Sequence, residues 1–197
     1  MALFSTAYWA PTSYYLLATQ SNRVQIEQYE FYQKQSYRNR CTILSANGPL
    51  SLVVPILRPH QRLIRDIRID YSKPWQRIHW RAIEAAYRSA AYFQEYHQEV
   101  LALYQRETPF LFDLNLQTWE LGRKLLALAL PWSFTASFAP VANHSDDYRN
   151  QIHPKRNRLI SLQPYFQVFA NKFGFVPDLS ILDLIFNEAK IFLPLYD

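Results

Sequence analysis

Apolar and polar residues alternate in the opening segment, which predicts strands around a short helix. Residues 2–9 ("ALFSTAYW") fit a short strand, residues 12–20 fit a helix started by Thr12 or Ser13, and residues 23–29 ("RVQIEQY") fit a second strand. Strand, helix and strand in succession predict a βαβ-like start.

The next apolar runs predict a hairpin and one more strand. Asn47-Gly48 lies between two β-rich runs, and this dipeptide suits a tight hairpin turn, so residues 39–46 and 50–57 are expected to pair. Residues 64–70 ("IRDIRID") alternate isoleucine with charge, which is typical of a half-buried strand.

Helical periodicity dominates the middle and the end of the chain. Residues 75–107 predict a long helix or a pair of helices, with Ser72 placed to cap the start. Further helices are expected at residues 113–129 and 177–190, the last with Ser180 and Asp183 as a capping box. "SFTASFA" (133–139) reads as a strand.

These elements predict one domain over residues 1–197. We expect an α/β (or α+β) fold, in which several helices cover a mixed sheet with a βαβ-like start and a hairpin. Residues 143–158 ("NHSDDYRNQIHPKRNR") are nearly all polar, which predicts a long exposed loop.

Composition excludes several classes of site. With 3 Gly there is no glycine-rich phosphate loop, and 1 Cys (Cys41) allows neither an intrachain disulfide nor a cysteine-based zinc cage. The five histidines lack metal-site spacing, so no metal or cofactor is expected. There is no apolar run long enough for a transmembrane segment and no signal-peptide pattern, which predicts a soluble cytoplasmic protein.

Positive charge is concentrated in one quarter of the chain. The net charge is +5, yet residues 31–81 hold ten of the 21 Lys and Arg against two acids, Asp66 and Asp70. Such a field favours an anionic ligand; the alternative is a solvated basic surface.

Within that segment, "FYQKQSYRNRC" (31–41) packs cations among aromatic rings. In an extended chain Arg38 and Arg40 project from the same face, joined by Lys34, which would suit a phosphate or carboxylate. The alternative is that these cations pair with core acids such as Asp113 or Asp183.

His79 and Asp113 are the candidate catalytic residues. His79 lies beside a row of charged residues on the predicted helix (Arg77, Arg81, Glu84, Arg88), where neighbouring cations favour the neutral imidazole that a general base needs. A histidine between Ile78 and Trp80 also suits simple packing, and Asp113 also suits a helix N-cap.

Four blocks of sequence, in this order, resemble the WbqC-like family: "YEFYQKQSYRNRCTI", "DYSKPWQRIHWRAIEAAYRSAAYF", "FLFDLNL" and "FGFVPDLSILDLIFNEA". The resemblance implies a bacterial protein of O-antigen or other surface-polysaccharide assembly. The family's recurring positions correspond here to Lys34, Arg38, Asn39, Arg40, Trp75, His79, Trp80, Tyr87, Asp113, Asn115, Ser180, Asp183 and Asn187. With Arg81, we expect the ligand-binding set to be Lys34, Arg38, Asn39, Arg40, Trp75, Trp80, Arg81 and Tyr87.

Three functions remain open from the sequence. The first is a transferase that uses a phosphate-bearing activated donor, such as a nucleotide sugar, with His79 as base. The second is a module that binds nucleic acid or an anionic glycan, of which nucleic acid is the less expected partner because the basic field is small. The third is a non-catalytic assembly protein, for which the many aromatic residues would serve as interface anchors.

Overall fold

A βαβ unit opens the chain, as the sequence predicts. The computed structural model describes residues 1–57, 62–138 and 146–189. In it β1 (Ala2–Ser5) and β2 (Val24–Glu27) pair in parallel and are joined by α1 (Thr12–Thr19). β5 (Trp132–Phe134) adds to the other side of β2, also in parallel. All three strands therefore end at the same edge of this sheet.

The predicted hairpin is present, with its turn shifted by one residue. β3 (Arg40–Ser45) and β4 (Gly48–Val53) are antiparallel, and Ser45 pairs with Gly48 across a two-residue turn, Ala46-Asn47. Gly48 has a φ of 104°, a conformation that residues with a side chain rarely adopt. The Asn-Gly signal thus identifies the hairpin, but the glycine is the first residue of β4 rather than part of the turn.

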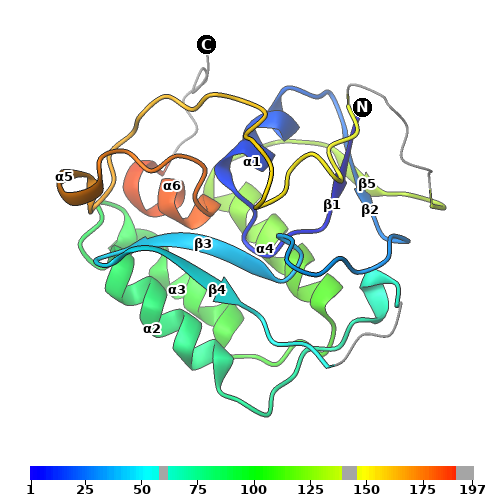
Figure 1. Ribbon diagram of the computed structural model, residues 1–197, viewed down its shortest axis with the longest axis horizontal. Coiled ribbons are helices and arrows are strands. Elements are labelled where there is room, and N and C mark those ends of the chain that lie inside the picture. Colours follow the sequence, from blue (N-terminus) through cyan, green and yellow to red (C-terminus); the bar gives the residue numbers. More distant parts are fainter. Residues whose placement is uncertain (58–61, 139–145, 190–197) are drawn as a thin grey trace.

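The predicted helices from residue 75 onwards are confirmed, and residues 75–107 form a pair. These helices are α2 (Trp75–Tyr87), α3 (Phe93–Tyr104), α4 (Leu111–Leu125) and α6 (Ile181–Glu188), with a short α5 (Ala170–Phe173) that the sequence did not suggest. In Figure 1 the hairpin lies between α6 on one side and α2 with α3 on the other, while α4 crosses the centre beside α1.

Two local predictions are wrong. Residues 64–70 do not form a regular strand: Ile64–Asp66 is a 3-10 turn, and only isolated bridges follow, from Arg68 to Phe110 and from Ile69 to Ile56. The Ser180 hydroxyl does cap α6 by accepting from the Leu182 N–H at 3.3 Å. The Asp183 carboxylate, however, accepts hydrogen bonds from Tyr165 and Gln167. The second bond of a capping box, from this side chain back to the Ser180 backbone N–H, is therefore missing.

The predicted α/β class holds, with parallel and antiparallel pairs in two separate sheets within a single compact domain. A continuous core of aromatic and aliphatic side chains runs from Phe4 and Trp9 through Tyr87 to Phe186. Among the described residues, no helix is both long and apolar enough to cross a bilayer.

The predicted exposed loop is only partly exposed. Residues 143–145 lie outside the described residues, and Asp147 and Arg149 are buried, whereas residues 154–158 are exposed. Leu3 forms a parallel bridge to Asp147, so residues 146–148 extend the sheet beside β1. The polar sequence does not predict this buried position beside β1. Burial of Asp147 and Arg149 is possible because their charges are paired.

Candidate functional site

Arg38 is buried in an internal ion pair. Its side chain is 3% exposed; its guanidinium is paired with Glu30, with Nε donating to Oε1 at 2.9 Å, and Nη2 also donates to the Ser5 hydroxyl at 2.7 Å. Burial raises the pKa of the Glu30 carboxyl, and Arg38 opposes that rise. Arg38 therefore compensates a buried carboxylate and is not available to a ligand.

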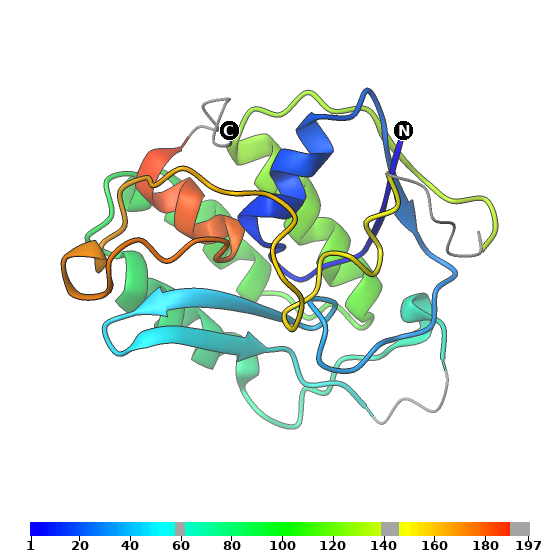
Figure 2. The same cartoon turned by 45° about the horizontal axis from the view of Figure 1, so that its top comes forward.

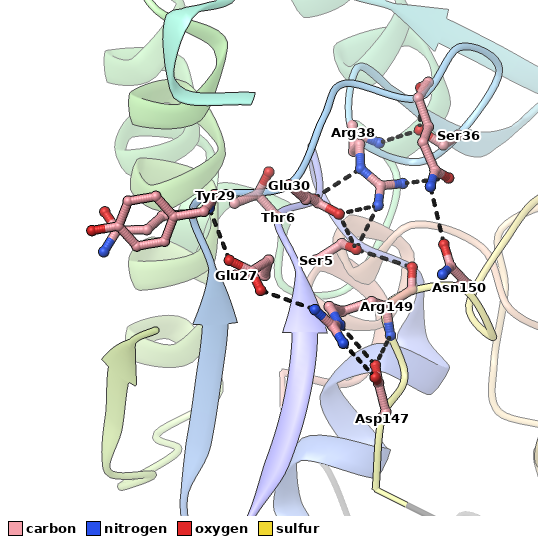
Figure 3. Close-up of polar contacts among 12 residues, drawn as sticks. Ser5, Thr6, Glu27, Tyr29, Glu30, Ser36, Arg38, Asp147, Arg149 and Asn150 are labelled. Carbon is pink, nitrogen blue, oxygen red and sulfur yellow. Dashed lines mark hydrogen bonds and ion pairs between the residues drawn. The ribbon is translucent and has the colours of Figure 1, made fainter. Parts of the chain in front are cut away.

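A second buried pair lies beside it, as Figure 3 shows. Arg149 donates to Glu27 at 2.9 Å and to Asp147 at 2.6 and 2.9 Å, all inside the protein. The Ser5 hydroxyl links the two pairs, because its oxygen lies 3.0 Å from Glu30 Oε2 and 2.9 Å from the Arg149 carbonyl oxygen, either of which can accept its single proton. We call these six residues the buried charge network (Ser5, Glu27, Glu30, Arg38, Asp147, Arg149).

The network occupies the carboxyl ends of β1 and β2, where open α/β sheets commonly bind their ligands. In this protein the position is filled by the protein's own charges.

The three cations of residues 31–41 do not share one face, contrary to the prediction. A turn intervenes, with Gln35 at a φ of 58°, so the segment is not extended. Lys34 is exposed, Arg38 turns inward to Glu30, and Arg40 is half-buried at the start of β3. The partner of Arg38 is neither Asp113 nor Asp183 but Glu30, eight residues earlier.

His79 lies in the core. It is 3% exposed and its Nδ1 is 2.9 Å from the Tyr8 hydroxyl, which in turn is 2.7 Å from the Tyr104 hydroxyl. Burial lowers its pKa to about 4. Burial, and not the neighbouring cations of the prediction, thus favours the neutral imidazole, and a side chain only 3% exposed is poorly placed to act as a base on a substrate, so the structure supports the packing role.

The remaining candidates are also structural or dispersed. Trp75 and Tyr87 are buried, Trp80 stacks on Phe93, and Arg81 is exposed on α2. Asp113 is exposed in the first turn of α4, where burial of part of the carboxyl raises its pKa.

Two buried amides fix the start of the hairpin. Asn39 Nδ2 donates to the Val54 carbonyl at 2.9 Å, and Asn115 Nδ2 donates to the Arg38 carbonyl at 2.8 Å. Asn39 thus holds the backbone rather than a ligand.

A cavity does lie next to the 31–41 segment, formed by the second polar loop. Gln33 donates to Asn150 at 3.1 Å and Lys155 donates to Gln35, so residues 150–158 lie against residues 33–35; in Figure 2 this yellow segment passes just above the start of the hairpin. The cavity between this loop, α1 and residues 177–178 has a volume of about 250 Å³. We call it the basic pocket; its lining residues are Ser13, Tyr37, Gln151, Ile152, His153, Pro154, Arg156, Asn157, Arg158, Leu159, Pro177 and Asp178.

The basic pocket continues into a wider depression. The depression is lined by Lys155 together with Gln151, Arg156, Asn157 and Leu159, four residues that it shares with the pocket. None of the ten residues predicted as catalytic or ligand-binding lines either hollow.

The pKa of His153 reflects the positive charge around the pocket. Its pKa is lowered, first by burial and then by the positive charges of Arg156, Arg38, Lys155 and Arg40. Its Nδ1 accepts the Lys155 backbone N–H at 3.1 Å, so in the neutral form the ring proton is on Nε2, which remains a donor. Arg156 and Arg158 form no ion pair within the described part of the chain.

Phosphate should raise the pKa of His153. A bound anion would offset the cations that lower it, so the NMR titration midpoint of His153 should move up by about one unit in saturating inorganic phosphate. His97, on α3, serves as the control resonance. If phosphate leaves the His153 midpoint unchanged and shifts no other resonance, no anion enters the pocket.

The pocket residues were not among the predicted site residues, because a polar segment such as 143–158 predicts an exposed loop. The signal was present: "HPKRNR" (153–158) places one histidine and three cations within six residues. Such a cluster indicates an anion site only when a second segment closes over it, and that depends on long-range contacts.

Comparison with known proteins identifies the family. The model of the "WbqC-like protein family" matches residues 7–161. The chain belongs to the WbqC-like family. A stretch of 79 residues is 37% identical to "Uncharacterized protein Rv1507c" of Mycobacterium tuberculosis (strain ATCC 25618 / H37Rv), covering 39% of this chain. It covers 33% of that relative, so the chain aligns with about a third of its length. A comparison with solved structures finds no match.

The match to the WbqC-like model includes both loops at the basic pocket, residues 33–40 and 150–158, but not residues 177–178 of its lining. Over the described ranges, no group of three or more His, Cys, Asp or Glu side chains could hold a metal ion.

Proposed function

We propose that this WbqC-like protein binds a phosphate-bearing activated donor in the basic pocket and transfers part of it during the assembly of a surface polysaccharide. The observation that carries the proposal is the pocket itself, which Arg156, Arg158 and His153 line together and where none of the three has a carboxylate within ion-pair distance among the described residues. Guanidinium groups bind phosphate in bidentate fashion, and His153 Nε2 adds a donor.

The size of the two hollows fits such a donor. About 250 Å³ is small for a complete nucleotide sugar, since pockets for drug-sized ligands run from roughly 300 to 1,000 Å³. The adjoining depression, of about 450 Å³, gives the rest of the donor room to extend past Lys155 and Arg156. The proposal places this reaction in the cytoplasm of a bacterium, as expected from the sequence.

Binding without turnover is the second candidate function. It is favoured by the burial of His79, which takes the predicted base out of reach of a substrate. In this form the protein delivers or retains an activated donor for an assembly partner. A donor-consumption assay on the wild-type protein separates turnover from binding alone.

The binding test uses a paired-arginine variant. Replacing Arg156 and Arg158 together (Arg156→Ala, Arg158→Ala) removes two charge-assisted contacts, so we expect the affinity for a nucleotide sugar such as UDP-glucose to fall at least about tenfold by isothermal titration calorimetry.

The matched control replaces Arg77 on α2 and Arg88 at its C-terminal cap, two exposed cations, and thus changes the net charge equally. We expect this control to bind like the wild type. Equal losses in both double variants would mean that only the overall charge matters, and no binding of any nucleotide sugar by the wild type would remove the proposal.

A further inference from the structure

The lining of the basic pocket discriminates among the classes of phosphate-bearing donor. The cations belong to residues 153–158, the part of the wall that other segments form carries Asp178, Ser13 and Tyr37, and Gln151 and Asn157 add their amides. Its apolar members are Ile152, Leu159 and two prolines. An acyl chain would leave these carboxylate and amide groups desolvated and unpaired, whereas the hydroxyls of a sugar would hydrogen-bond with them.

Asp178 is held firmly in that wall. Its backbone has a φ of 62°, and its Oδ1 accepts the Ser13 backbone N–H, in the first turn of α1, at 2.8 Å. Burial raises its pKa, while Ser13 and the charge of Arg158 oppose the rise. The carboxylate therefore lies on a fixed support, facing a pocket in which its charge is offset by Arg158 on another segment.

We infer that the basic pocket binds a sugar phosphate. The phosphate lies at Arg156 and Arg158, and a sugar hydroxyl donates a hydrogen bond to the Asp178 carboxylate. Tyr37 also lines the pocket and supplies an aromatic ring against which the C–H side of the sugar can pack. This inference rests on the proposed function for the anion half of the site and adds the identity of the group that the phosphate carries.

Three small ligands test it on the wild-type protein. Inorganic phosphate probes the cations alone, butyl phosphate adds an apolar group, and glucose 1-phosphate adds a sugar. We expect glucose 1-phosphate to bind at least about tenfold more tightly than inorganic phosphate, and butyl phosphate to gain nothing. Butyl phosphate binding as tightly as the sugar phosphate would overturn the inference.

Asp178→Asn adds an opposite-sign test. The asparagine oxygen still accepts from Ser13, so the start of α1 keeps its partner, and a melting curve checks this. Loss of the negative charge should strengthen binding of inorganic phosphate a few-fold, while the ratio of affinities for glucose 1-phosphate and inorganic phosphate falls at least about fivefold. An unchanged ratio would contradict a role for Asp178.

The two proposals fail in different ways. If inorganic phosphate binds and the Arg156→Ala, Arg158→Ala variant loses it, the anion site stands, and a sugar phosphate that binds no better than phosphate overturns only the sugar inference. If none of the three ligands binds the wild type, both proposals are overturned.

Discussion

Replacing Arg38 with alanine should destabilise the protein by about 3–5 kcal/mol, because it leaves the Glu30 carboxylate buried without its cation. The loss should be larger at pH 8 than at pH 5. Burial already raises the pKa of Glu30, and without Arg38 that pKa rises further, so acidification neutralises the unpaired carboxyl. Urea unfolding at the two pH values measures both effects.

Two variants control this experiment. Lys34→Ala removes an exposed cation four residues away and should change the free energy of unfolding by no more than about 0.5 kcal/mol. Combining Arg38→Ala with Glu30→Gln removes the unpaired charge and should recover part of the stability at pH 8. If Arg38→Ala unfolds like the wild type and loses phosphate binding instead, Arg38 belongs to the ligand site after all.

The fold is largely readable from the sequence where short-range physics decides it. The alternation in residues 23–29, the hairpin turn near Asn47 and the helical periodicity of residues 75–107 each predict the element found. Residues 64–70 fail because their alternation reflects half-burial against Phe110 and Ile56, contacts that a 3-10 turn and isolated bridges also supply.

The candidate site was harder to predict than the fold, because the sequence shows which residues are charged but not which residues they pair with. Arg38 and Arg149 resemble surface cations in the sequence, yet both are buried: Arg38 neutralises Glu30, eight residues earlier, and Arg149 neutralises Asp147 and also Glu27, which is 122 positions away. Conversely, "HPKRNR" resembles a solvated loop until residues 33–35 lie against it. Whether a cation is buried in an ion pair or lines a pocket therefore depends on the segment that packs against it more than on its position within its own loop.

Replacing Asp183 with asparagine should stabilise the protein above pH 7. Asp183 is fully buried and accepts hydrogen bonds from the Tyr165 hydroxyl and Gln167 Nε2 at one oxygen, both at 2.8 Å, and burial raises its pKa to about 6. A pKa above the ordinary value near 4 means that the stabilising contribution is complete below about pH 4 and is lost as the pH rises through about 6. Ionisation thus costs up to about 3 kcal/mol, which an uncharged asparagine avoids.

The pH profile distinguishes this charge effect from a packing effect. An asparagine oxygen can accept both existing donors, so the Asp183→Asn protein should exceed the wild type by about 2 kcal/mol at pH 8, with the gap closing by pH 4 to 5 as the native carboxyl becomes neutral. Asp66→Asn, at an exposed carboxylate, should show no such trend. A gap that stays constant with pH would indicate a packing effect and not a charge effect. A variant less stable than the wild type at pH 8 would mean that Asp183 is ionised and stabilising in the folded protein, and that its two hydrogen bonds outweigh the cost of burial.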